Sequence, residues 1–177
     1  MAKREALREL QSRLAARLQA VRTEARTTSW LAVECAGAGF LMPLSSAGEI
    51  FPVGSALPVP HTRPWFLGVA NLRGGLHGIV DLAAFLGLRA ALAPTEAVRG
   101  DQARWVALNP SLGTHCALQV ERLAGLRSQA QLTSEPDADA PRPAFAAASW
   151  RDEDGRVWQE IDLAALARHE QFLGIAL

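Results

Sequence analysis

Three observations predict a mainly β fold built of small β-barrels. Short extended apolar segments recur along the chain, most of them end at Gly, Pro, Asn or Asp, and only brief helical stretches lie between them. A parallel sheet wrapped in helices would need a longer helical segment after each strand. The length of 177 residues suits one full-sized domain.

The first segment, residues 1–27, is predicted to be an N-terminal amphipathic helical extension. Its apolar residues recur at steps of three and four, which places them on one stripe of a helix: Leu7, Leu10, Leu14, Leu18 and Val21. The segment lacks the bulky aromatic residues and the Lys-rich face of membrane-surface helices. We expect the stripe to pack on the domain that follows or to fray in solution, with a partner's helix as the alternative.

The remaining residues, 28–177, are predicted to form one domain with two β-barrel lobes. The period changes at Thr28, and residues 31–35 and 40–44 form a β-hairpin around the small-residue turn 36–39. Further strands are predicted at residues 49–53, 67–73, 76–80, 104–108, 114–120, 146–150 and 157–161.

Two short helices are placed by their ends. Asp81 is an N-cap acceptor for residues 82–86, which Gly87 terminates, and Asp162 repeats the start signal before residues 163–169. Because each helix follows directly on a strand, the two regions hint at related halves. Residues from about 133 to 144 are rich in Pro, Asp and Ala, and we expect a mobile surface loop there.

Composition excludes several classes of protein. Hydrophobic residues make up 49% and charged residues 20%, and Lys+Arg 18 balances Asp+Glu 18, which argues against a disordered chain and against nucleic acid as a partner. No apolar run reaches the roughly 20 residues that cross a bilayer, and no secretory signal begins the chain, so we expect a cytoplasmic protein without direct membrane insertion. Cys35 and Cys116 are far apart and are expected to be buried, reduced thiols.

No catalytic or cofactor-binding constellation is convincing. The glycine-rich run at residues 73–78 lies between two strands and leads into no helix, so it predicts a hairpin turn and not a phosphate cradle. Ser111 and His115 lack the G-x-S-x-G context of a nucleophile, and an extended run sends His115 and Cys116 to opposite faces. The sequence therefore predicts no enzyme, no metal and no cofactor.

Five tryptophans and no tyrosine are an unusual combination. Trp30, Trp105, Trp150 and Trp158 fall in predicted strands, and core packing accounts for them. Trp65 follows a Pro-rich connection, where we expect it to be half exposed as a lid over a barrel end, with an interface contact as the alternative.

Residues 40–88 carry an ordered series of motifs: FLMPLSSAGEIFPV, LPVPHTRPWFLGVANLRGG and LHGIVDLAAFLGL. The series resembles the CheW family of adaptor domains, whose signature x-G-V-x-N-L-R-G falls on residues 67–74 and whose Val-Asp-Leu element falls on residues 80–82. The resemblance covers roughly residues 28–169 and is looser after residue 88.

The resemblance implies two packed SH3-like five-stranded β-barrels, short helices and no catalysis. Family members join methyl-accepting chemoreceptors to a CheA-like histidine kinase. One barrel's edge contacts a related barrel in the kinase C-terminal regulatory domain, and a groove between barrels takes the cytoplasmic tip of the receptor. This chain would then be recruited to membrane-associated receptor arrays.

Two segments are similar to sequences in the branch of the family that controls type IV pili and twitching motility. They are residues 29–34, SWLAVE, and the Arg-rich first segment. The alternatives are a general adaptor of flagellar chemotaxis, or a stand-alone regulatory barrel domain of a CheV-type or kinase protein.

The resemblance also implies partner-binding residues. The signature falls on Asn71, Leu72, Arg73 and Gly74, with Arg73 as the receptor-facing residue and Glu49 as its charge partner. The simpler alternatives are a solvated strand end for Arg73 and a surface charge for Glu49, with a tight turn of positive φ at residues 74–75.

The sequence departs from the family pattern at two neighbouring positions. His77 stands where an aliphatic residue is usual, and Gly78 stands where a proline usually precedes the Val-Asp-Leu element. Glycine frees the backbone where proline would stiffen it, so the local strand geometry and the partner contact are expected to differ.

Overall fold

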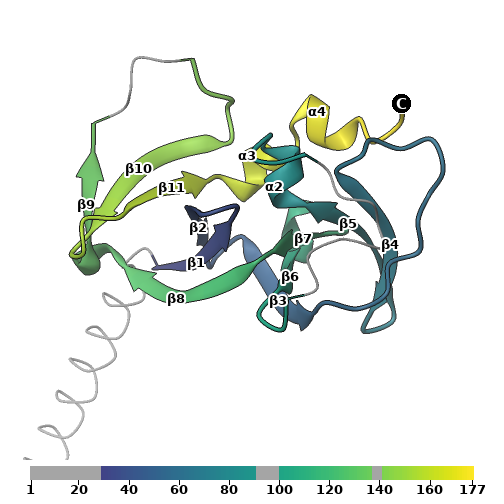
Figure 1. The fold of residues 1–177 in the computed structure, drawn as a ribbon, viewed down its shortest axis with the longest axis horizontal. Coiled ribbons are helices and arrows are strands. Elements are labelled where there is room, and N and C mark those ends of the chain that lie inside the picture. The colour runs from purple at the N-terminus through teal and green to yellow at the C-terminus, as the bar shows by residue number, and fades with distance from the viewer. Residues whose placement is uncertain (1–28, 91–99, 137–140) are drawn as a thin grey trace, which may run out of the picture.

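Figure 1 shows a computed structural model of the chain, which describes residues 29–90, 100–136 and 141–177. Its strands form two packed sheets, one with the order β8-β1-β2-β11-β10-β9 and one with the order β3-β6-β7-β5-β4. The strands are β1 (Ser29–Cys35), β2 (Ala38–Pro43), β3 (Ala47–Pro52), β4 (Phe66–Leu72), β5 (Gly75–Asp81), β6 (Arg104–Leu108), β7 (Cys116–Val120), β8 (Arg122–Ser128), β9 (Leu132–Glu135), β10 (Ala146–Asp152) and β11 (Val157–Ile161). The helical elements are α2 (Leu82–Phe85), η1 (Pro110–Leu112), η2 (Gln129–Gln131), α3 (Leu163–Leu166) and α4 (Glu170–Leu173).

The two sheets have the same internal order. The hairpins β1-β2 and β6-β7 are each extended by an antiparallel strand, β8 or β3, and by a parallel strand, β11 or β5. The strand that follows, β10 or β4, is antiparallel again. The first half of the sequence therefore places the hairpin β1-β2 in the first sheet and β3, β4 and β5 in the second sheet. The second half places the hairpin β6-β7 in the second sheet and β8, β10 and β11 in the first, which confirms the hint of related halves.

The packed sheets create three groups of buried side chains. One group fills the first sheet around Trp30 and Trp158, and a second fills the other sheet around Trp105 and Ile79. The largest group draws on both sheets and on α2, α3 and α4, which lie together where the sheets meet (Figure 1). Strand β1 contributes Leu31 to this shared group and Trp30 to the first sheet's own group, because successive strand residues point to opposite faces.

Both helix starts that the sequence predicts are confirmed. The Asp81 carboxylate accepts a hydrogen bond from the Ala84 amide at 3.2 Å, and Asp162 accepts from the amides of Ala164 and Ala165 at 2.9 and 3.0 Å. Gly87, with φ of 70°, follows α2 as expected.

Trp65 differs from its prediction. It is only 7% exposed, not half exposed, because its indole lies parallel to the Phe172 ring at 6.4 Å and edge-on to the Phe85 ring at 5.1 Å. Helices α2 and α4 thus enclose this side chain, and an interface contact by Trp65 is excluded in this conformation.

The loop predicted from residue 133 onward also differs. Residues 132–135 form β9, which pairs with β10 from Asp152↔Leu132 to Ser149↔Glu135. The additional strand gives the first sheet six strands, while the second has the five expected. The predicted N-terminal helix lies outside the described residues, as do residues 137–140 of the loop.

Candidate partner-binding groove

The signature residues form the hairpin turn between β4 and β5. Leu72 pairs with Gly75, and the two residues between them have positive φ, 50° for Arg73 and 85° for Gly74. Positive φ at both central residues is the type I′ geometry that suits the twist of a two-residue hairpin. Asn71 stabilises the turn, because its side-chain oxygen accepts the Gly74 amide at 2.8 Å.

The turn is shifted by one residue from its prediction. Gly75 does not have positive φ and already belongs to β5, while Arg73 is a turn residue and not the end of a strand. Arg73 is a non-glycine residue in the left-handed region, where its Cβ is crowded, so the hairpin holds this side chain at a conformational cost.

Arg73 and Glu49 contact each other across the second sheet. The Arg73 Nη2 atom lies 2.6 Å from the Glu49 Oε1 atom, and the two side chains are 75% and 41% exposed. An ion pair this exposed contributes about 1 kcal/mol or less to folding. The pair is therefore available for exchange with a partner's charges.

The pair stands at a groove of about 460 Å³ between β3 and β4, the two edge strands of the second sheet. Four of the five predicted residues line the groove: Glu49, Asn71, Leu72 and Arg73. Gly74 does not line it and lies at the tip of the turn. The groove lies within one barrel, whereas the family resemblance placed the receptor groove between the barrels.

Seven further lining residues were not among the predicted site residues, and three of them have large apolar side chains. Ile50 and Phe51 follow Glu49 on β3, and the ring of Trp105 closes the groove from β6. Ile50 is 38% exposed, although it is a large apolar residue. The sequence gives no signal for this exposure, because it depends on how β3 faces β4 in the folded chain.

The Pro-rich link defines where the groove ends. Leu57 and Val69 exchange backbone hydrogen bonds of 2.7 and 2.9 Å, so the link covers the first part of the outer edge of β4. This contact needs Gly68, which has φ of 125° and whose added Cβ would lie 2.1 Å from the Leu57 oxygen. From Ala70 to Arg73, that edge lines the open groove.

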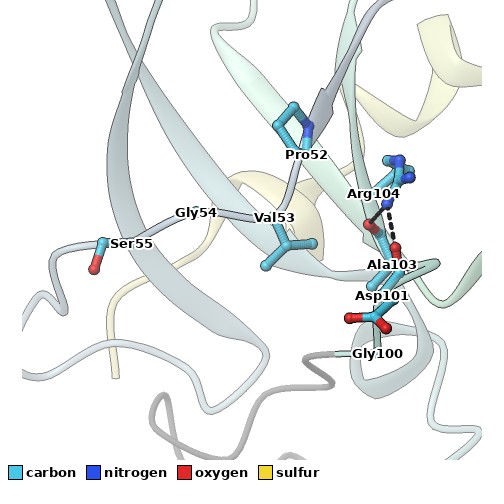
Figure 2. A pocket seen from close by; sticks show the side chains of 8 residues that line it. All are labelled: Pro52, Val53, Gly54, Ser55, Gly100, Asp101, Ala103 and Arg104. Atoms are coloured by element: carbon cyan, nitrogen blue, oxygen red, sulfur yellow. Dashed lines mark hydrogen bonds between the residues drawn. The ribbon is translucent and has the colours of Figure 1, made fainter.

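A second pocket of about 410 Å³ adjoins the groove at Pro52, Gly54 and Ser55 (Figure 2). The guanidinium of Arg104 lines this second pocket and already donates hydrogen bonds to the carbonyl oxygens of Asp101 and Ala103, at 2.8 and 2.6 Å. This pocket contains none of the predicted site residues.

The described residues hold no group of three or more His, Cys, Asp or Glu side chains that would form a metal site. Burial raises the pKa of the Cys35 and Cys116 thiols to about 12, so both are protonated and unreactive. Ser111 lies on η1, and His115 is exposed while Cys116 is buried, as the extended run predicted. Strand β5 runs without interruption through His77 and Gly78.

A CheW-like domain model matches residues 29–171. The chain belongs to the CheW family. CheW-like proteins are non-catalytic scaffolds of chemotaxis-type signalling, and the two-barrel fold expected for the family is the fold seen here.

Individual relatives agree with the CheW assignment. The chain is 29% identical over 168 residues to Protein PilI of Pseudomonas aeruginosa, covering 93% of this chain and 89% of that protein. It is 42% identical over 52 residues to Chemotaxis protein CheW of Rhizobium meliloti, covering 29% of this chain and 34% of that protein.

The scaffolding protein TtCheW of Thermoanaerobacter tengcongensis has the same fold as this CheW-like chain. The TM-score is 0.63 at 17% identity, and the match covers 77% of this chain and 85% of that structure. Among the residues that the structure describes, no helix has the length and apolar character required to cross a bilayer.

Proposed function

We propose that this CheW-like protein is a non-catalytic adaptor that couples methyl-accepting chemoreceptors to a CheA-like histidine kinase in the system that controls type IV pili and twitching motility. The similarity to PilI, which extends over 93% of the chain, favours the pilus system. The similarity to the chemotaxis CheW is higher but covers only 29% of the chain, so a flagellar adaptor is the second candidate.

The observation that carries the proposal is the groove between β3 and β4. It combines an exposed ion pair, Arg73 and Glu49, with the apolar side chains of Ile50, Phe51 and Trp105. Transient signalling contacts use this combination, in which apolar contact supplies affinity and fixed charges supply specificity. The groove receives the cytoplasmic tip of the receptor, and Arg73 contacts an acidic side chain on it.

The kinase occupies a different surface. Its C-terminal regulatory domain packs against a barrel edge, so that receptor and kinase bind the same adaptor molecule in the cytoplasm at receptor arrays. The adaptor itself performs no turnover and binds no nucleotide. Asn71, Leu72 and Gly74 serve this function indirectly, because they shape the turn that presents Arg73.

The test measures the affinity of the full chain for two separate partners, a receptor cytoplasmic fragment and the kinase C-terminal regulatory domain. The variant Ile50→Asp places a charge among the apolar groove residues, and we expect it to weaken receptor binding by roughly tenfold or more while kinase binding persists. Leu126→Asp is the matched control, because Leu126 is an exposed apolar strand residue of the other sheet, 62% exposed.

Each result has a defined meaning. Equal receptor affinity for Ile50→Asp and the unmodified chain would remove the groove from the receptor interface. Loss of kinase binding alone would assign the groove to the kinase. Failure of the unmodified chain to bind either partner would contradict the adaptor function.

A further inference from the structure

Two histidines that the proposed function does not use lie side by side on the second sheet. His77 belongs to β5 and His115 directly precedes β7, and the parallel register of these strands aligns Gly78 with Cys116. The centroids of the two imidazole rings are 5.7 Å apart, and the ring planes are inclined at 81°. His115 is exposed and His77 is partly buried.

The backbone fixes this arrangement. The Gly78 amide donates a hydrogen bond to the His115 carbonyl oxygen at 3.0 Å, which ties the two histidine positions together. A proline at position 78 has no N–H and would lose this bond. The two departures from the family pattern, His77 and Gly78, therefore contribute to one local structure.

The hydrogen bonding of His77 selects its tautomer. Its Nδ1 atom lies 3.0 Å from the Gly75 carbonyl oxygen, which accepts hydrogen bonds and cannot donate them. Nδ1 therefore carries the proton in the neutral ring, and Nε2 keeps its free lone pair. A histidine that donates one ring N–H to a backbone carbonyl and presents the other nitrogen is prepared for metal ligation.

We propose that His77 and His115 form a two-imidazole site for a divalent transition-metal ion of the zinc, nickel or copper class, which imidazole ligands suit. Metal–nitrogen distances of about 2.0–2.1 Å place two rings on one tetrahedral ion with centroids roughly 5 Å apart. The observed centroid distance of 5.7 Å is close to that value. This proposal does not rest on the adaptor function.

Water or a partner's side chain completes the coordination. The described part of the chain supplies no cluster of three or more potential ligands, so the site has two ligands from this protein and open positions. A site of this kind binds its ion reversibly and more weakly than a four-ligand structural zinc site, which contributes directly to folding.

Calorimetric titration of Ni²⁺ or Zn²⁺ into the full, tag-free chain at about pH 7.5, where free imidazole is mostly neutral, tests the site. We expect one ion per chain, with affinity reduced at least tenfold in His77→Gln and in His115→Gln. His61→Asn is the control, because His61 is an exposed histidine outside the pair and has φ of 58°, which asparagine tolerates. Unchanged affinity in the double variant would overturn the proposal, as would the absence of binding up to roughly 1 mM ion.

A second measurement uses the unmodified chain and so does not depend on the folding of variants. Substoichiometric Cu²⁺ broadens the NMR signals of amides close to the bound ion. We expect broadening centred on residues 75–78 and 114–116. Broadening centred on His61 or His169 instead would place the metal elsewhere and contradict the two-imidazole site.

Discussion

Arg73 shows how a single residue can matter for binding more than for stability. Its ion pair with Glu49 is exposed, so Arg73→Glu is expected to lower the melting temperature by less than about 4 °C. The same change reverses the charge at the proposed receptor contact and should weaken receptor binding roughly tenfold or more. Thermal unfolding and receptor-dependent kinase activation of the variant measure the two effects separately.

The matched control is Arg151→Glu. Arg151 pairs with Glu135 at 2.7 Å on the first sheet, and the side chains are 44% and 26% exposed. Both variants reverse an exposed arginine, but only Arg73 lies at the groove. Equal activation by Arg73→Glu and the unmodified chain would take Arg73 out of the interface, and a large fall in melting temperature would give it a structural role.

Glu34 is the opposite kind of charged residue, because it is largely buried and joins three segments. Burial alone raises its pKa, but hydrogen bonds and charges from Arg122 and Arg156 outweigh burial and hold the pKa below its usual value. A carboxyl whose pKa is lowered on folding stabilises the protein above its unfolded-state pKa. That stabilisation is lost as the pH falls through the folded-state pKa.

Glu34→Gln should therefore destabilise the protein by about 1–3 kcal/mol at neutral pH. The difference in unfolding free energy between Glu34→Gln and the unmodified chain should shrink as the pH falls below about 4, where the free carboxyl is protonated. Chemical denaturation across this range measures it. A difference that stays constant with pH would mean that charge is not what Glu34 contributes.

At the scale of elements, Gly68 decides how the Pro-rich link lies on β4. An added Cβ would lie 2.1 Å from the Leu57 oxygen, and φ of 125° disfavours any side chain. Gly68→Ala is expected to destabilise the fold by about 3 kcal/mol or more, since both the strand and the link must move. Gly74→Ala is the control: its φ of 85° is also positive, but nothing lies within 4 Å of the added Cβ, so we expect a loss of about 1–2 kcal/mol. Equal losses would mean that the contact with Leu57 is unimportant.

Elements with local signals were predictable from the sequence. The caps at Asp81 and Asp162 depend on residues close in the chain, so their positions follow from residue type. The turn after β4 was predicted as well, but one residue later than its observed position. Strand β8 was not predicted, because none of its residues is fully buried and its extended form depends on pairing with β1. Strand β9 likewise depends on β10, which overrides the loop composition of residues 133–135.

The candidate site was likewise predicted only in part. The Arg73–Glu49 contact was predicted through the family resemblance and is present. Its surroundings were not predicted, because the groove exists only where the edge strands β3 and β4 face each other across Trp105. Trp65 was misplaced for a similar reason: its burial depends on Phe172, which is distant in the sequence.

At the scale of the whole molecule, the two sheets are expected to unfold together. Each half of the sequence supplies strands to both sheets, and the largest buried group draws on both. Unfolding one sheet would expose the apolar face of the other to water. Cys35 in the first sheet and Cys116 in the second both belong to this shared group and report on it separately.

Thiol labelling tests this cooperativity. Cys35 is 0% exposed and Cys116 is 5% exposed, and burial raises both pKa values to about 12, so neither should react in the native state. In the single-thiol variants Cys116→Ala and Cys35→Ala, we expect the remaining thiol to be labelled with an opening free energy equal to that variant's global unfolding free energy. Each Cys→Ala change removes a buried sulfur atom and so lowers the stability of the variant. The labelling of each variant is therefore compared with that variant's own denaturation curve. A thiol labelled tenfold or more faster than its variant unfolds would show that its sheet opens alone, and the shared core would then not couple the two barrels.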